Sequence, residues 1–251
     1  MTLLRALYSE QLKLKRTVAL QIVLLAPGLI VLLLFIYLYL QPPHIALKEW
    51  LSLESPALGL WAVFVMPLYI TLETALVAGL DHSGNQWKSL LARPVPRWTL
   101  YVAKLTVVIV MTVISTAVLL CGILIDGAIL TRLRPDVHVG FPVPWSAVLR
   151  DCAQVAGLSF PALTIQHWVS VRWRSFSVAF AFGVKATVFC GCAFAIGRQI
   201  GGRLQYLPWA LPILPLTEGS DDLGSVLLIA AAAGLVVTAA GCWDFGRREV
   251  S

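Results

Sequence analysis

The stretch DHSGNQWKSLLARPVPRWTLYVAKL, residues 81–105, follows an apolar run at 58–80 and leads into a second one at 102–124. Each run is long enough to cross the hydrocarbon core of a bilayer, which takes about 20 residues of helix. The residues between them are polar and basic and include two prolines, Pro94 and Pro96. This pattern is typical of two membrane-spanning helices joined by a loop in water.

The composition of the whole chain agrees with a membrane protein. Of its 251 residues, 59% are apolar and only 13% are charged, and the mean hydropathy is +0.83. Soluble domains are about one-quarter charged. The sequence predicts an all-α membrane protein with a single domain over residues 1–251 and six spans. The six spans cover 18–40, 58–80, 102–124, 145–168, 176–196 and 223–243. The fourth span is the weakest, because Asp151 and Gln154 lie in it.

The distribution of Lys and Arg predicts the orientation. With a cytoplasmic amino terminus, most of the basic residues outside the spans lie on the cytoplasmic side, which is the usual bias of membrane proteins. Both termini are therefore expected in the cytoplasm. The net charge of +6 is explained by these loops, so no nucleic acid partner is expected.

Residues 1–17 are too polar to span a membrane. Their apolar residues recur near helical spacing, and their basic residues gather on the other side. This predicts an amphipathic elbow helix on the inner membrane surface, which either braces the domain or merely anchors the first span. The apolar set is Leu3, Leu4, Leu7, Tyr8 and Leu14, and the polar set is Arg5, Ser9, Lys13 and Arg16.

The spans contain features that predict their packing. Pro27, Pro67 and Pro161 are expected to kink their helices. The last two spans carry small residues at four-residue intervals, which let another helix approach closely. These rows are Ala179, Gly183, Thr187, Gly191 and Ala195 in the fifth span, and Ala230, Gly234, Thr238 and Cys242 in the sixth.

Glu73 and Lys185 are the ionisable residues deepest in the predicted spans. A charge facing lipid costs a few kcal/mol on translocon scales, so each should face protein or a water-filled cavity. Glu73 is expected in an ion pair with Arg97 or Lys104, as a helix cap near the inner boundary, or in a gating contact. Lys185 is expected to pair with Glu73 or Asp151, or to line a path for an acidic or lipid-headgroup ligand.

The segment before the last span reads GRQIGGRLQYLPWALPILPLTEGSDD, residues 197–222. It is too apolar for an ordinary loop and too rich in proline for a span. We expect short broken helices that dip into the outer leaflet, with aromatic side chains at the headgroup level. The candidate residues are Tyr206, Pro208, Trp209 and Pro212.

Motifs for catalysis are missing from the sequence. It has no GxxxxGK[ST] phosphate loop, no HExxH and no GxSxG, and its four histidines are scattered. The five cysteines all fall within predicted spans and form no CxxC pair. We expect neither an enzyme nor a bound metal or cofactor.

The loop between the second and third spans, within residues 81–105, has a predicted structure of its own. Asp81 or Ser83 can cap a short helix over about 83–95, with Trp87, Leu90 and Leu91 on one face. The two prolines then make a rigid corner. Such a helix can fit a groove on a cytoplasmic protein, or it can rest on lipid; the residues alone leave both open.

Several patches in and around this loop resemble those of ABC-2-type permeases, the membrane subunits of ATP-binding cassette transporters. The matching residues are Glu73, then Asn85, Gln86, Trp87 and Lys88, then 90–97 with Leu90, Leu91 and Pro94, and finally 101–104. Arg93 departs from the family, which often has a small or apolar residue there. The start at 10–16, the predicted six spans and the YLPWALP segment at 206–212 are similar to bacteriocin and lantibiotic self-immunity permeases.

The resemblance implies an ABC-2 membrane domain of the type V exporter kind in the inner membrane of a bacterium. It implies that a separate ABC ATPase, which binds ATP and Mg²⁺, docks on 83–95 as the coupling helix. It also implies pairing with a second permease and export of an amphipathic peptide, an antibiotic or a lipid. A secondary transporter and a non-transporting membrane scaffold are the alternatives from other classes.

Overall fold

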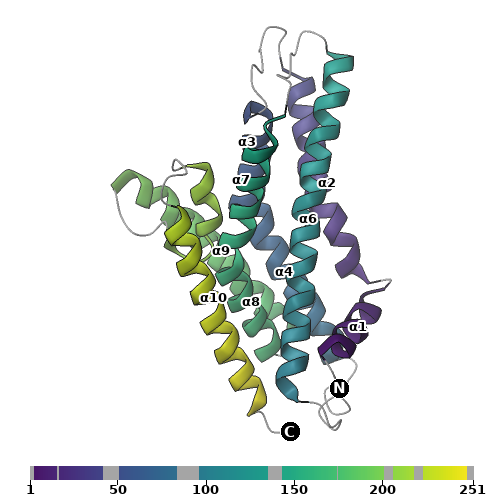
Figure 1. Ribbon diagram of the computed structural model, residues 1–251, viewed down its shortest axis with the longest axis vertical. Coiled ribbons are helices and arrows are strands. Elements are labelled where there is room, and N and C mark those ends of the chain that lie inside the picture. Colours follow the sequence, from purple (N-terminus) through teal and green to yellow (C-terminus); the bar gives the residue numbers. More distant parts are fainter. Residues whose placement is uncertain are drawn as a thin grey trace.

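The computed structural model describes residues 3–15, 17–41, 51–83, 96–134, 143–173, 175–200, 206–217 and 223–247. This part of the chain is helical, without a strand (Figure 1). Its main helices are α1 (Leu3–Leu14), α2 (Val18–Tyr39), α3 (Leu51–Leu60), α4 (Met66–Ser83), α6 (Arg97–Leu133), α7 (Trp145–Leu158), α8 (Phe160–Arg172), α9 (Phe176–Ile200) and α10 (Leu223–Gly246).

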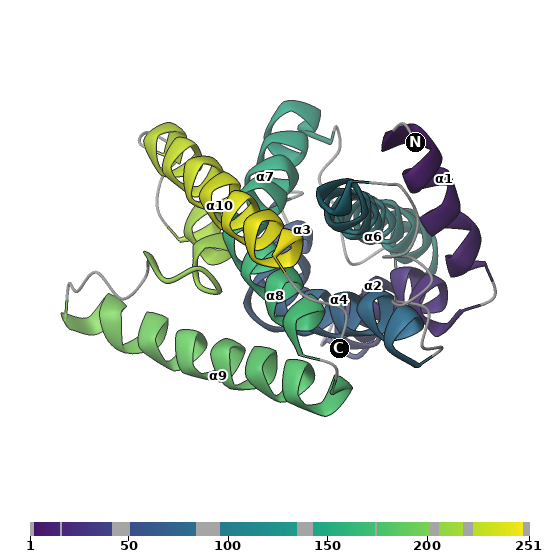
Figure 2. The same cartoon turned by 90° about the horizontal axis from the view of Figure 1, so that it is seen from below.

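The long helices run up and down one bundle (Figure 1). The chain rises in α2, descends through α3 and α4, rises in α6, descends through α7 and α8, rises in α9 and descends in α10. The amino and carboxyl ends therefore lie at the same end of the bundle, at the bottom of Figure 1. The end of α4 and the start of α6 lie there too, and α1 lies beside the lower part of α6 at the edge of the bundle (Figures 1 and 2).

Five helical segments are long and apolar enough to cross a membrane within the described ranges: Val18–Tyr39, Leu53–Asp81, Arg97–Leu133, Phe176–Ile196 and Leu223–Gly246. They coincide with five of the six predicted spans. The third is the longest, with 37 residues, so it extends beyond a hydrocarbon core about 30 Å thick.

The expected fourth span, 145–168, is not one continuous helix. It is divided into α7 with 14 residues and α8 with 13 residues, which meet at Ser159. Pro161 has no N–H to donate to the carbonyl of Gly157, which interrupts the helical ladder at this point. The Ser159 hydroxyl donates to the carbonyl of Ala156 at 2.7 Å. Neither helix alone is long enough to cross, so the count of six spans stays a prediction.

The second span contains one turn of π-helix, η1 (Trp61–Val65), between α3 and α4. The Met66 N–H donates to the carbonyl of Trp61, five residues back. Pro67 follows directly, and its missing N–H disfavours a regular α-helix here. The irregularity expected at Pro67 is thus a π turn. It leaves the Trp61 ring buried, with its Nε1 donating to the Thr116 hydroxyl at 3.2 Å.

Glycines allow close helix contacts at four points of the bundle, one of them Gly122 of α6 against Val31 of α2. A Cβ atom at Gly183 of α9 would overlap the side chain of Thr71 of α4. On α10, Gly234 packs in the same way against Phe160, and Gly241 against Tyr101.

The predicted rows of small residues serve these contacts only in part. In the fifth span, Ala179, Gly183 and Thr187 are buried, whereas Ala195 is exposed and a Cβ at Gly191 would meet open space. In the sixth, Ala230 and Gly234 are buried, but the contact then moves from Thr238 to Gly241. The shift keeps the packing stripe on one side of a straight helix.

Candidate functional site

Four charged side chains form a closed ring where α1, α4 and α6 meet. The Lys104 ammonium group lies 2.7 Å from Glu10 Oε2 and 2.5 Å from Asp81 Oδ2. The Lys13 ammonium group lies 2.6 Å from Glu10 Oε1 and 3.0 Å from Asp81 Oδ1. Each carboxylate therefore bridges both lysines, and each lysine bridges both carboxylates. We call these four residues the charge ring.

The local structure explains why these side chains converge. Glu10 and Lys13 are three residues apart on α1, so they share one face of the helix. On the same side, Ala6 and Leu14 are buried against the bundle. Asp81 lies in the last turn of α4, and Lys104 lies in the first turns of α6. The ring thus ties α1 to both helices.

The charge ring is almost entirely out of water. The side chains of Asp81 and Lys104 are 0% and 2% exposed, that of Glu10 is 3% exposed, and Lys13 reaches the surface with 21%. Burial would lower the pKa of Lys13, but its contacts with Glu10 and Asp81 raise that pKa above its ordinary value. The charges of the two carboxylates and the two ammonium groups cancel, so the ring is compact and neutral overall. Removing one member of such a buried set leaves an unpaired charge.

The ring flanks the segment that the sequence predicts as the coupling helix. Asp81 precedes residues 84–95 and Lys104 follows them. The predicted docking residues Asn85, Gln86, Trp87, Lys88, Leu90, Leu91 and Pro94 lie outside the described residues. The chain connects that segment to the bundle through the ends of α4 and α6, where the ring lies.

Glu73 is buried in α4 but is not in the ion pair expected for it. Lys104 is taken up by the charge ring, and an Arg97 Nη1 donates to the carbonyl of Gly246 at 3.3 Å. Both carboxylate oxygens of Glu73 lack a hydrogen-bond partner in the described part of the chain. The expected partners were wrong because Lys104 meets α4 two helical turns further along, at Asp81.

Lys185 is exposed on α9 and is not paired with Glu73 or Asp151. Asp151 instead lies beside Arg150, with 3.3 Å between Nε and Oδ1. The reason is geometric. Gly183 faces α4, and Lys185 follows it by two residues, which turns the lysine about 200° around the helix and away from the bundle.

The predicted outer-leaflet residues are divided by the fold. Tyr206 is exposed and Pro208 is partly exposed, but Trp209 and Pro212 are buried. The 3₁₀ helix η3 (Leu211–Leu216) packs against α7 and α3. Trp209, which was expected at the headgroup level, is a core residue.

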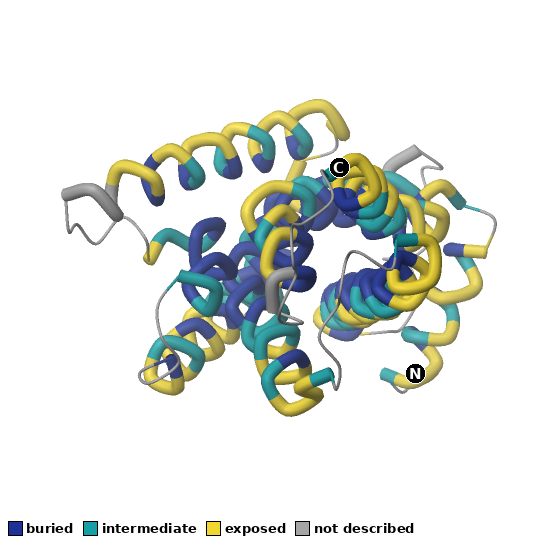
Figure 3. The backbone as a smooth tube through the Cα atoms, turned by 90° about the horizontal axis from the view of Figure 1, so that it is seen from above, coloured by how far each residue is buried: buried dark blue, intermediate teal, exposed yellow. Residues whose placement is uncertain are grey.

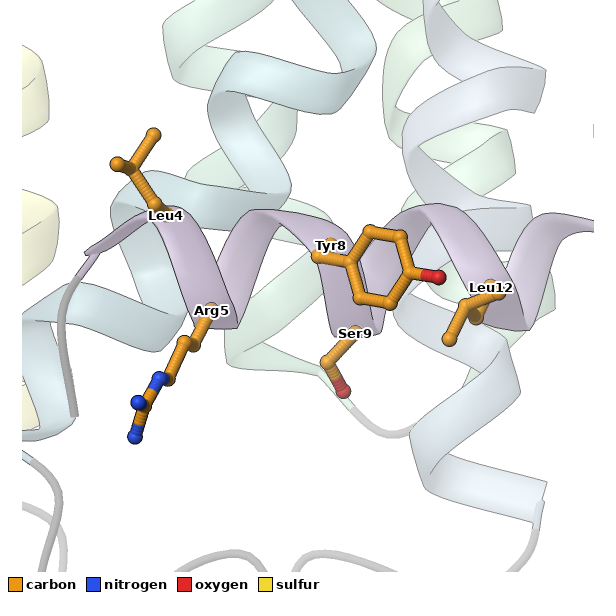
Figure 4. A pocket seen from close by; sticks show the side chains of 5 residues that line it. All are labelled: Leu4, Arg5, Tyr8, Ser9 and Leu12. Atoms are coloured by element: carbon orange, nitrogen blue, oxygen red, sulfur yellow. The ribbon is translucent and has the colours of Figure 1, made fainter.

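Helix α1 does not divide into the two faces expected for it. Lys13 and Leu14, predicted on opposite sides, both turn toward the bundle, Lys13 into the charge ring. The outward side carries a shallow pocket lined by Leu4, Arg5, Tyr8, Ser9 and Leu12 (Figure 4). In Figure 4, Arg5 and Ser9 point down, away from the bundle, while Leu4 points up. That α1 lies on the membrane surface stays a prediction.

The charge ring could not be predicted from the sequence. Glu10 and Lys13 carry a local signal, because their spacing on a helix is that of an ion pair. Their contacts with the rest join distant parts of the chain: Lys104 is 94 residues from Glu10, and Asp81 is 68 residues from Lys13. The predicted orientation puts all four at one end of the bundle, but only the packing selects the partners.

Several helices that can each span a bilayer within one chain define a multi-pass membrane protein. Residues 6–191 match the family model described as ABC-2 family transporter protein, which is well over half of the chain, and the chain belongs to this family. It is a membrane transport subunit of the kind that normally works with an ABC ATPase subunit. No curated protein and no solved structure matches it.

Proposed function

We propose that the chain is the permease subunit of an ABC exporter whose separate ATPase docks on residues 83–95. Family membership supports a transport role, and the chain has no phosphate loop of its own. The observation that carries the proposal is the charge ring, which joins the two helices flanking that segment to α1.

The charge ring is suited to transmit motion from one helix to another. When the ATPase closes, the docking segment pushes on α4 at Asp81 and on α6 near Lys104. Moving one helix without the other separates opposite charges in a medium of low dielectric constant, which is costly. The three elements α1, α4 and α6 therefore move as one body, and α1 carries the motion to its end of α2.

The proposed substrate is an amphipathic compound dissolved in the membrane, such as a bacteriocin or lantibiotic-like peptide, an antibiotic or a lipid. One permease of about six spans is too small to enclose a path for such a compound. We therefore propose that two permeases, identical or related, form the path between them in the bacterial inner membrane, with all four chain ends in the cytoplasm.

The test is co-purification. If the reading frame next to this gene encodes an ABC ATPase, the two proteins are co-expressed, and the tagged permease is purified in detergent. We expect the ATPase to be retained, and its ATP hydrolysis to depend on the permease. An ATPase that never binds the permease, in any detergent that keeps the permease folded, contradicts the proposal.

A further inference from the structure

The outward side of α9 is an apolar stripe with one charge in it. Val178, Phe182, Phe189 and Ile196 are exposed, from 40% to 65%, and Lys185 is exposed among them. Figure 3 shows the two sides of α9, one buried and the other exposed, and Figure 2 shows α9 at the edge of the bundle. The close contact of Gly183 with Thr71 fixes this orientation.

The position of Lys185 makes lipid tails costly surroundings for its charge. The candidate span is Phe176–Ile196, and Lys185 is near its centre, about 14 Å along the helix from the first residue at 1.5 Å per residue. This distance exceeds the reach of an extended lysine side chain, which can snorkel to the headgroups only from near a helix end. The ammonium group needs an anion or water at this depth.

The chain itself does not supply that anion in the part that the structure describes. Asp151 lies beside Arg150, and Asp244 lies near Arg172 and accepts from Trp168. The other described acidic residues are buried, namely Glu10, Glu54, Glu73, Asp81 and Asp126. The remaining acids of the sequence fall outside the predicted spans. In a homodimer, the described residues of the second copy would offer Lys185 only these same buried or partnered carboxylates.

We propose that the exposed apolar stripe of α9 that surrounds Lys185 is a subsite for the transported compound. This subsite selects amphiphiles with an anionic headgroup. The ammonium group of Lys185 binds the anion, and the exposed rings of Phe182 and Phe189 pack against the apolar part. These rings lie three residues before and four residues after the lysine, which puts all three side chains on one helix face. The inference rests on the proposed export function and names its substrate class.

The experiment measures binding to the full-length permease alone, so it does not depend on the ATPase. The permease is purified in a neutral detergent and titrated with dodecyl phosphate, and bound molecules are counted by native mass spectrometry. We expect Lys185→Met to weaken binding by about tenfold, which is typical for loss of one hydrogen bond to a charged group. Lys185→Arg should restore it. The matched control is Lys15→Met, which removes an exposed cation just after α1 and should change nothing.

Two further arms complete the test. Phe189→Ala keeps the charge and should also weaken dodecyl phosphate binding, and dodecyltrimethylammonium should bind wild type and Lys185→Met equally. Equal affinity of wild type and Lys185→Met for dodecyl phosphate overturns the subsite. If phosphatidylglycerol binds at Lys185 and Lys185→Met leaves export unchanged, the site holds a membrane lipid and the substrate assignment is wrong. Loss of ATPase co-purification would instead affect only the proposed function.

Discussion

The ammonium group of Lys104 lies 2.5 Å from the carboxylate of Asp81, so the helices on either side of residues 84–95 are joined directly. Glu10 adds α1 to this contact at 2.7 Å. The helix ends that flank this segment are therefore fixed to each other and to a third helix.

Lys104→Met should destabilise the protein strongly, because it leaves two buried carboxylates with one lysine. Removing one partner of a buried ion pair lowers the free energy of unfolding by roughly 3–5 kcal/mol. The measurement is thermal unfolding of the purified permease. The double variant Asp81→Asn with Lys104→Met keeps the Glu10–Lys13 pair and should recover part of the loss. Equal melting temperatures for wild type and Lys104→Met would show that the ring does not stabilise the fold.

Glu10→Gln should uncouple transport from ATP hydrolysis, because α1 then loses its charged contact with α6 while residues 84–95 are unchanged. We expect the ATPase still to co-purify, whereas ATP-driven export into inverted vesicles falls by about tenfold, the effect of losing roughly 1.4 kcal/mol of coupling. Gln11→Ala, an exposed neighbour on α1, is the control. Full export by Glu10→Gln would rule out transmission through α1.

Trp87→Ala and Leu91→Asp should reduce ATPase co-purification and leave the permease inserted in the membrane. Both residues lie on the predicted apolar face of the coupling helix, where a central aromatic side chain of an interface can contribute 2 kcal/mol or more, that is, about 30-fold in affinity. Ser89→Ala, on the other side of that predicted helix, should have no effect. Unchanged retention of the ATPase by both variants contradicts docking at this segment.

Gly183→Ala should lower the stability of the bundle, because the new methyl group overlaps Thr71 of α4. Forcing one extra carbon into a packed interface costs about 1–3 kcal/mol. The matched control is Gly191→Ala two turns further along α9, where a Cβ meets open space and replacing glycine favours the helix. The two variants should shift the melting temperature in opposite directions, and Thr71→Ala should partly rescue Gly183→Ala.

The sequence was sufficient to locate most of the spans, because the apolar length needed to cross a bilayer is fixed by its thickness. It was less informative where several local effects compete. Asp151, Gln154 and Pro161 weaken the fourth span, and the fold resolves this conflict with two helices meeting at Ser159. Hydropathy also misplaced Trp209, because an aromatic residue suited to the headgroup layer fits equally well in a core.

The candidate site was harder to predict for a different reason. Which charges pair depends on how α1, α4 and α6 are rotated about their axes, and helical periodicity fixes only the rotation of each helix relative to its own apolar side. Lys104 illustrates this. The sequence places Lys104 at the start of α6. At that depth in the membrane it could meet either Glu73 or Asp81, and the packing of the helices selects Asp81.

The π turn at Trp61–Val65 has a consequence for the far end of the same span. It holds one residue more than a regular turn would need between α3 and α4. Deleting a single residue there would restore ordinary winding and rotate the rest of α4 by about 100°. Asp81, twenty residues after Trp61, would then swing out of reach of its lysines, so the charge ring at one end of the bundle depends on one extra residue far along the same span.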